Sequence, residues 1–104
     1  MMGKYKITDV LLSIEEKARE MGYYSRYCEG LGIPNESDTL CLRSNDVKVF
    51  IRDYNNPKVA KPFYVQIVYN NYDYIGMYEA SELYEMIERL WKWPKGYIKE
   101  NFEK

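Results

Sequence analysis

The chain has 104 residues, of which 46% are hydrophobic and 30% charged, so we expect one compact globular domain over residues 1–104. The formal net charge of -1 gives no overall positive field that favours nucleic acid or anionic lipid. No apolar run approaches the roughly 20 residues that cross a bilayer, and no signal peptide is visible, so we expect a protein without membrane attachment.

The N-terminal part of the sequence predicts an amphipathic helix. Its apolar residues recur at helical spacing: Ile7, Leu11, Ile14, Ala18 and Met21. Thr8 is the expected N-cap, and Gly22 is the expected left-handed stop. Residues 23–27 fit either a strand or a short helix, and we favour an extended segment.

Two hairpins are predicted in the middle of the chain, where the apolar period changes to the alternation of strands. Residues 39–43 and 47–54 flank the turn 44–46, and residues 63–69 and 72–78 flank Asn70 and Asn71. Two asparagines tolerate positive φ and therefore favour a two-residue primed turn. This turn fixes the register of the second hairpin, with Tyr69 opposite Tyr72.

A second helix is predicted to begin at Glu79. Its apolar stripe consists of Ala80, Leu83, Ile87, Leu90 and Trp91. Acidic residues at its start and basic residues near its end suit the helix dipole. Pro94 and Gly96 are expected to stop it, which makes residues 95–104 a short C-terminal tail whose apolar side chains can pack down.

These elements predict an α+β fold in the order α-β-β-β-β-α, with an antiparallel sheet of about four strands and both helices packed on one sheet face. The residues expected to face the helices are Leu40, Leu42, Val47, Val49, Ile51, Phe63, Val65 and Ile67. The other face then carries aromatic, aliphatic and basic side chains, a composition typical of interface cores. The alternative is that residues 23–27 or the C-terminal tail cover this second face.

Seven residues are therefore candidates for a protein interface: Phe50, Arg52, Tyr54, Tyr64, Ile75, Met77 and Trp93. Trp93 is included because tryptophan dominates many binding hot spots. A nucleic-acid site would instead use Lys48, Arg52, Lys58 and Lys61 together with aromatic stacking.

Several kinds of chemistry find no support in the sequence. The chain has no histidine. This excludes catalytic sites in which histidine activates a serine or cysteine nucleophile, and it excludes the commonest metal ligand. We identify no catalytic residue, metal site, cofactor site or small-molecule site, so we expect a protein that is not an enzyme. A carboxylate- or thiol-dependent enzyme ranks third among the functions considered.

The two cysteines, Cys28 and Cys41, are expected to be reduced thiols in a cytoplasmic protein.

The element order resembles that of the double-stranded-RNA-binding domain. That family places a basic cluster at the start of its last helix, whereas this chain has Glu79-Ala80-Ser81-Glu82 there, so RNA binding is not implied. The size and order are also similar to small phage-encoded inhibitors, anti-CRISPR proteins among them. We therefore expect a protein-interaction module, an inhibitor or regulatory adaptor that binds a protein partner or itself. The alternative is a nucleic-acid-binding protein.

Overall fold

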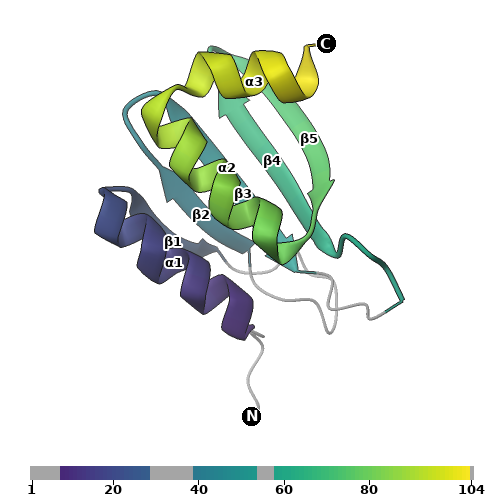
Figure 1. Cartoon of the computed structure of the whole chain (residues 1–104). Helices are drawn as coiled ribbons and strands as arrows, with labels where there is room; N and C mark the ends of the chain where they lie inside the picture. Colours follow the sequence, from purple (N-terminus) through teal and green to yellow (C-terminus); the bar gives the residue numbers. More distant parts are fainter. Residues whose placement is uncertain (1–7, 29–38, 54–57, 104) are drawn as a thin grey trace.

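The computed structural model describes residues 8–28, 39–53 and 58–103. Its elements are α1 (Asp9–Met21), β1 (Tyr24–Cys28), β2 (Thr39–Arg43), β3 (Val47–Asp53), β4 (Phe63–Tyr69), β5 (Tyr72–Tyr78), α2 (Ala80–Lys92) and α3 (Pro94–Phe102). The strands form one antiparallel sheet in the order β1-β2-β3-β4-β5. All three helices lie on the same face of this sheet (Figure 1). The predicted α+β class is confirmed.

Two segments differ from the prediction of four strands and a tail. The extended interpretation of residues 23–27 is confirmed, but this segment is a fifth strand, β1, which pairs with β2. Residues 95–104 are not a simple tail, because α3 begins at Pro94. Proline at a first helical turn loses no hydrogen bond, so Pro94 ends α2 and also starts α3.

The predicted ends of α1 are confirmed. Thr8 Oγ1 accepts a hydrogen bond from the Leu11 backbone N–H at 3.2 Å. Gly22 has a φ of 117°, in the left-handed region that glycine reaches without strain. A Cβ atom on Gly22 would lie 2.7 Å from the Trp91 ring, so a larger residue would also have to displace this ring. Ile7 lies outside the described residues.

The turn at Asn70 and Asn71 matches the sequence prediction. Both residues have positive φ, 55° and 69°, as a type I′ turn requires. The register follows, with Tyr69 opposite Tyr72.

The core lies between the sheet and the helices. All eight sheet residues predicted to face the helices are buried. The helices add Leu11, Ile14, Ala18, Leu83, Met86, Ile87, Leu90, Tyr97 and Ile98 to this core. Trp91, predicted in the stripe of α2, instead lies at the rim, where its ring centroid is 5.0 Å from that of Tyr23.

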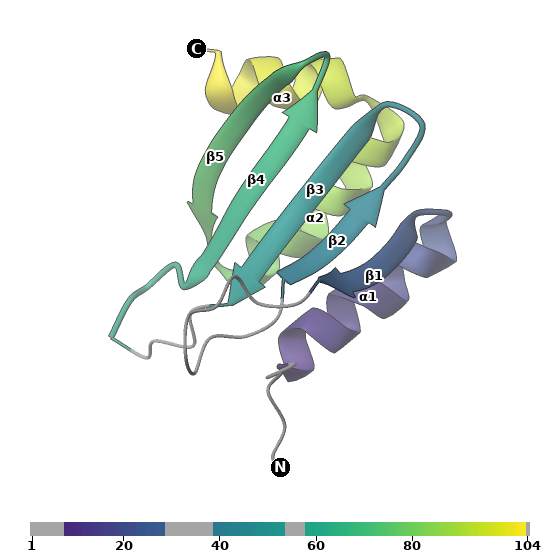
Figure 2. The same cartoon turned by 180° about the vertical axis from the view of Figure 1, so that it is seen from behind.

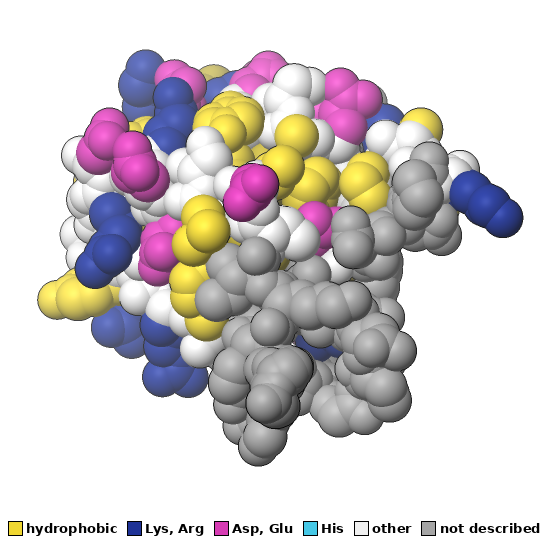
Figure 3. Space-filling model, turned by 90° about the horizontal axis from the view of Figure 1, so that it is seen from below, with side chains coloured by type: hydrophobic (Ala, Val, Ile, Leu, Met, Phe, Trp, Pro, Cys, Tyr) yellow, Lys and Arg dark blue, Asp and Glu magenta, His cyan; other side chains and the backbone are white. Residues whose placement is uncertain are grey.

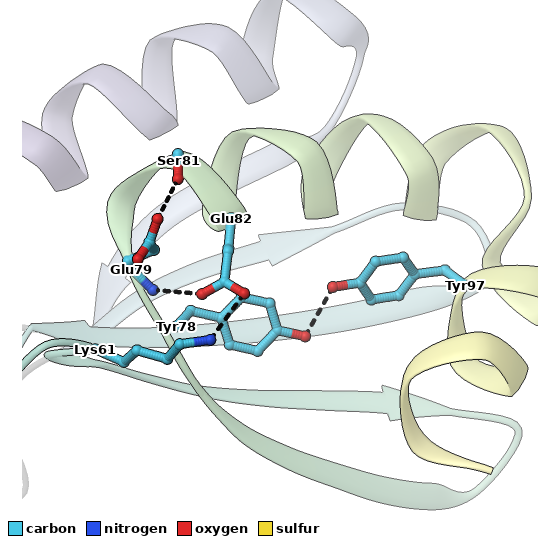
Figure 4. Close-up of polar contacts among 6 residues, drawn as sticks. All are labelled: Lys61, Tyr78, Glu79, Ser81, Glu82 and Tyr97. Atoms are coloured by element: carbon cyan, nitrogen blue, oxygen red, sulfur yellow. Dashed lines mark hydrogen bonds and ion pairs between the residues drawn. The ribbon is translucent and has the colours of Figure 1, made fainter. Parts of the chain in front are cut away.

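Side chains at the start of α2 connect the helix to its surroundings (Figure 4). The Glu82 carboxylate accepts hydrogen bonds from the Glu79 backbone N–H and from Lys61 Nζ, each at 3.0 Å. The Glu79 N–H and then Lys61 hold the pKa of the Glu82 carboxyl below its usual value. Deeper in the structure, the hydroxyls of Tyr78 and Tyr97 share a buried hydrogen bond of 2.8 Å.

We expect the protein to lose stability as the pH rises above about 10. Burial raises the pKa of the Tyr23 phenol, whose hydroxyl donates to the Ile87 carbonyl, and that of the Tyr97 phenol. Both phenols ionise near pH 10 in the unfolded chain but stay neutral in the folded one. Unfolding therefore releases protons at alkaline pH, and the free energy of unfolding falls as the pH rises.

Thermal unfolding across a pH series checks this expectation. The double variant Tyr23→Phe/Tyr97→Phe should be less stable than the wild type at pH 7, because buried hydrogen bonds are lost. Its stability should nevertheless fall less steeply with pH above 10. Equal alkaline slopes for the two proteins would contradict the assignment.

Candidate binding surface on the open sheet face

The sheet face opposite the helices, here called the open face, is built from alternate strand residues. Because Val47, Val49 and Ile51 point into the core, their neighbours on β3 point to the other side. Strand pairing then aligns three rows across the sheet. The first row is Tyr24, Arg43, Lys48, Val68 and Asp73; the second is Arg26, Cys41, Phe50, Gln66 and Ile75; the third includes Thr39, Arg52, Tyr64 and Met77.

The two segments expected to cover this face do not cover it. Residues 24–28 extend the sheet at its edge as β1, and α3 packs on the same side as α2 (Figures 1 and 2). Figure 2 views the sheet from behind, with no helix in front of the strands. The alternative in which residues 23–27 or the C-terminal segment close the face is therefore wrong.

The structure separates the predicted interface residues by exposure. Ile75 and Met77 on β5 are 54% and 42% exposed, while Phe50 and Tyr64 are half-buried. Arg52 is only 5% exposed, and its Nη2 donates to Thr39 Oγ1 at 3.0 Å. Four of the predicted residues therefore offer apolar contact area on one face, whereas Arg52 is engaged within the sheet.

The two remaining interface candidates are not placed on this face. Trp93 is 63% exposed, but it lies between α2 and α3 in the helical layer. Tyr54 lies outside the described residues. Phe50, Tyr64, Ile75 and Met77 are thus the members of the predicted set that the fold brings together.

The predicted nucleic-acid residues do not form one patch. Lys48 is exposed on the open face, and Arg52 is buried. Lys61 Nζ lies 3.0 Å from the Glu82 carboxylate on the helical side. Lys58 is exposed in the segment that precedes β4. These cations therefore do not follow a common track along which a phosphate backbone would lie.

A different set of residues forms a hollow at the β1–β3 end of the open face. The hollow has a volume of about 360 Å³, and the open-face side chains that line it are Tyr24, Arg26, Cys41, Arg43, Lys48 and Phe50. The Arg43 guanidinium carbon lies 5.3 Å from the centre of the Tyr24 ring, in a cation–π contact. Tyr24, Arg26 and Arg43 were not predicted as site residues, because their role depends on the pairing of β1 with β2.

The open face is positively charged although the chain is not. Within the part of the chain that the structure describes, its exposed charged side chains are Arg26, Arg43 and Lys48 against one acid, Asp73, and the chain as a whole has a net charge of -1. The rest of the molecule therefore has an excess of acid. In the view from below, several basic side chains lie at the lower left, whereas acidic and basic side chains are mixed along the upper edge of the picture (Figure 3). An excess of basic side chains on the open face favours an anionic ligand there.

Cys41 lies at the edge of this hollow and is disulfide-bonded. The prediction of a reduced thiol is therefore wrong for Cys41, and the side chain of Cys28 lies outside the described part of the structure. Disulfides persist in oxidising compartments and are rare in reducing ones, so the cysteines no longer support a cytoplasmic location, which stays a prediction. The only other cysteine in the sequence is Cys28, whose backbone ends β1 opposite Thr39.

A second hollow, of about 310 Å³, runs between β5 and the helices. Its charged side chains include Glu82, which pairs with Lys61, and Arg89, which pairs with Glu100. Glu85 lines this hollow as well. Because Glu82 and Arg89 are paired within the protein, the hollow offers a ligand one further acidic side chain, in contrast to the three cations of the first hollow.

Two further features of the described residues bear on function. None of the described helices is long and apolar enough to cross a membrane. Within residues 8–28, 39–53 and 58–103, no cluster of three or more potential ligand side chains is arranged to hold a metal ion. Comparison with known proteins gave no match to any protein-family model, to any curated protein or to any solved structure.

Proposed function

We propose that the protein is a protein-binding module that uses the open face of its sheet. The carrying observation is that all three helices occupy one side of the sheet, which leaves Ile75 and Met77 exposed on β5, with Tyr64 opposite Met77 and with Phe50 on β3 beyond Gln66. Apolar and aromatic side chains on one face with neighbouring arginines resemble the centres of protein interfaces.

The backbone under this surface also favours binding. The side chains stand on five paired strands whose opposite side is fixed by the core. A surface held on a sheet loses little conformational entropy when a partner docks, so more of the contact energy appears as affinity. This rigidity distinguishes the open face from a patch on a loop.

The side chains on this face are of kinds that suit binding without catalysis. Its hollow presents cations and aromatic rings, which recognise charge and shape. A general base or an activated nucleophile needs a neighbouring group that takes up or supplies a proton, and the described lining residues include no carboxylate. A role as an inhibitor or adaptor needs only a surface that covers its partner, and such a role stays a prediction.

We expect the double variant Ile75→Asp/Met77→Asp to lose partner binding while keeping its fold. Both side chains are exposed in the free protein, so a carboxylate there stays hydrated, but it would be desolvated in an apolar interface at a cost of several kcal/mol. Affinity capture from the source organism, with quantitative mass spectrometry, compares the proteins retained by the variant and by the wild type.

Leu12→Asp is the matched control for this experiment. Leu12 is 45% exposed on the outside of α1, so the change also introduces acid at an exposed apolar position, but in the helical layer. The control should retain the partners of the wild type. Loss of the same partners in both variants, or in neither, would contradict binding through the open face.

A further inference from the structure

We propose that the hollow lined by Tyr24, Arg26, Arg43, Lys48 and Phe50 binds an acidic segment of the partner protein. Apolar residues of the same segment then lie on Ile75 and Met77. This inference rests on the proposed function, because it assigns the chemistry of the ligand that the open face takes. It commits to a peptide segment in which a group of carboxylates stands beside large apolar side chains.

The charge of the hollow is the first argument. Arg43 is paired with Lys48 across β2 and β3, and Arg26 is paired with Cys41 in the adjacent row. Neighbouring strands lie about 4.8 Å apart, so three positive groups occupy three adjacent strands. Among the described residues, none of these three side chains forms an ion pair. A carboxylate-bearing ligand would relieve their mutual repulsion and accept charge-assisted hydrogen bonds from the two guanidinium groups.

The composition of the second row is the next argument. This row runs from Arg26 through Phe50 and Gln66 to Ile75, and it therefore changes from basic to apolar across the sheet. Four strand spacings span about 19 Å, the length of about six extended residues. One short segment thus reaches both the cations and the apolar residues of β5.

The same geometry favours a peptide over a single-stranded nucleic acid. Single-strand binders combine a track of cations with aromatic rings that are free to stack on bases. Here Tyr24 is 74% exposed, although Arg43 lies over its ring, and the Phe50 ring is half-buried, so one aromatic ring at most is well exposed beside the cations. At the far end of the face, Asp73, Ile75 and Met77 offer a phosphate backbone no cation. An acidic and apolar peptide complements both ends.

Selection from a displayed library of random peptides tests the proposal and needs no identified partner. The wild type should enrich peptides in which Asp or Glu residues stand beside Leu, Ile, Phe or Trp. The variant Arg43→Glu/Lys48→Glu should lose these peptides, with at least a tenfold fall in affinity, and should enrich basic ones instead. Both positions are exposed, so the variant is expected to fold, and circular dichroism verifies it.

The control variant Arg19→Glu/Lys95→Glu makes the same change of charge at exposed positions of α1 and α3. It should select the same peptides as the wild type. Each enriched peptide is then measured by fluorescence anisotropy at low and high salt, where the affinity should fall with added salt. A labelled oligothymidylate is measured in parallel.

Three results would overturn the proposal. The first is enrichment of peptides without excess acid, or the same peptides for the wild type and for Arg43→Glu/Lys48→Glu. The second is oligothymidylate binding that exceeds peptide binding and is lost in that variant, which would assign the hollow to nucleic acid. The third is the absence of any enriched peptide while Ile75→Asp/Met77→Asp still abolishes capture of a protein partner. In that case the open face binds protein, but not through an acidic segment.

Discussion

Tyr97→Ala is expected to lower the free energy of unfolding by about 3–5 kcal/mol, the usual range for removing a buried aromatic ring. Tyr97 belongs to α3, and its ring is buried, with its centre 6.5 Å from the Phe102 ring centre and 5.2 Å from the Arg89 guanidinium carbon. Its loss leaves a cavity and also leaves the buried Tyr78 hydroxyl without its hydrogen-bond partner. Urea unfolding followed by circular dichroism measures the effect.

Tyr97→Phe is the control that separates packing from hydrogen bonding. It keeps the ring and removes only the hydroxyl, so we expect a loss of about 1–2 kcal/mol. If residues 95–104 were a tail outside the core, both substitutions would change stability by less than about 0.5 kcal/mol. That outcome would contradict the packing of α3.

Reduction of the disulfide at Cys41 is expected to lower the free energy of unfolding by about 2–4 kcal/mol. Cys41 lies in β2, between the edge strand β1 and β3. A disulfide restricts the unfolded chain, so its removal increases the entropy gained on unfolding. Urea unfolding with and without a reductant should give two different midpoints for the wild type.

Cys41→Ser provides the control for the reductant. This variant should be as unstable as the reduced wild type, and the reductant should not shift its midpoint further. Thiol titration of the purified, unreduced protein under denaturing conditions should find no free thiol. A wild type whose midpoint is unaffected by reductant, with titratable thiols before reduction, would contradict the disulfide.

Local signals in the sequence were sufficient for much of the fold. Thr8 and Gly22 bracket α1 as their cap chemistry requires, and positive φ at Asn70 and Asn71 sets the register of β4 and β5. Each of these depends on interactions between residues close together in the chain. The alternation of Val47, Val49 and Ile51 also sufficed to identify the buried face.

What the sequence did not reveal depends on contacts between distant segments. Pro94 and Gly96 resemble a helix stop, but the burial of Tyr97 and Ile98 against the core gives α3 its place. Arg26 becomes part of a site only because β1 pairs with β2, which brings it beside Cys41. Of the predicted surface, Phe50, Tyr64, Ile75 and Met77 could be placed together from the hairpin register, whereas the cationic hollow could not.

Mapping of a bound peptide on the isotope-labelled protein by nuclear magnetic resonance tests the central claim most directly. On titration with the strongest peptide from the library, we predict that the backbone amide shifts change most in β1, β2 and β3 around Arg26, Arg43 and Phe50. A second group of changes is expected on β5 at Ile75 and Met77. Changes confined to the outer surfaces of α1 and α2, with the strands unaffected, would contradict binding on the open face.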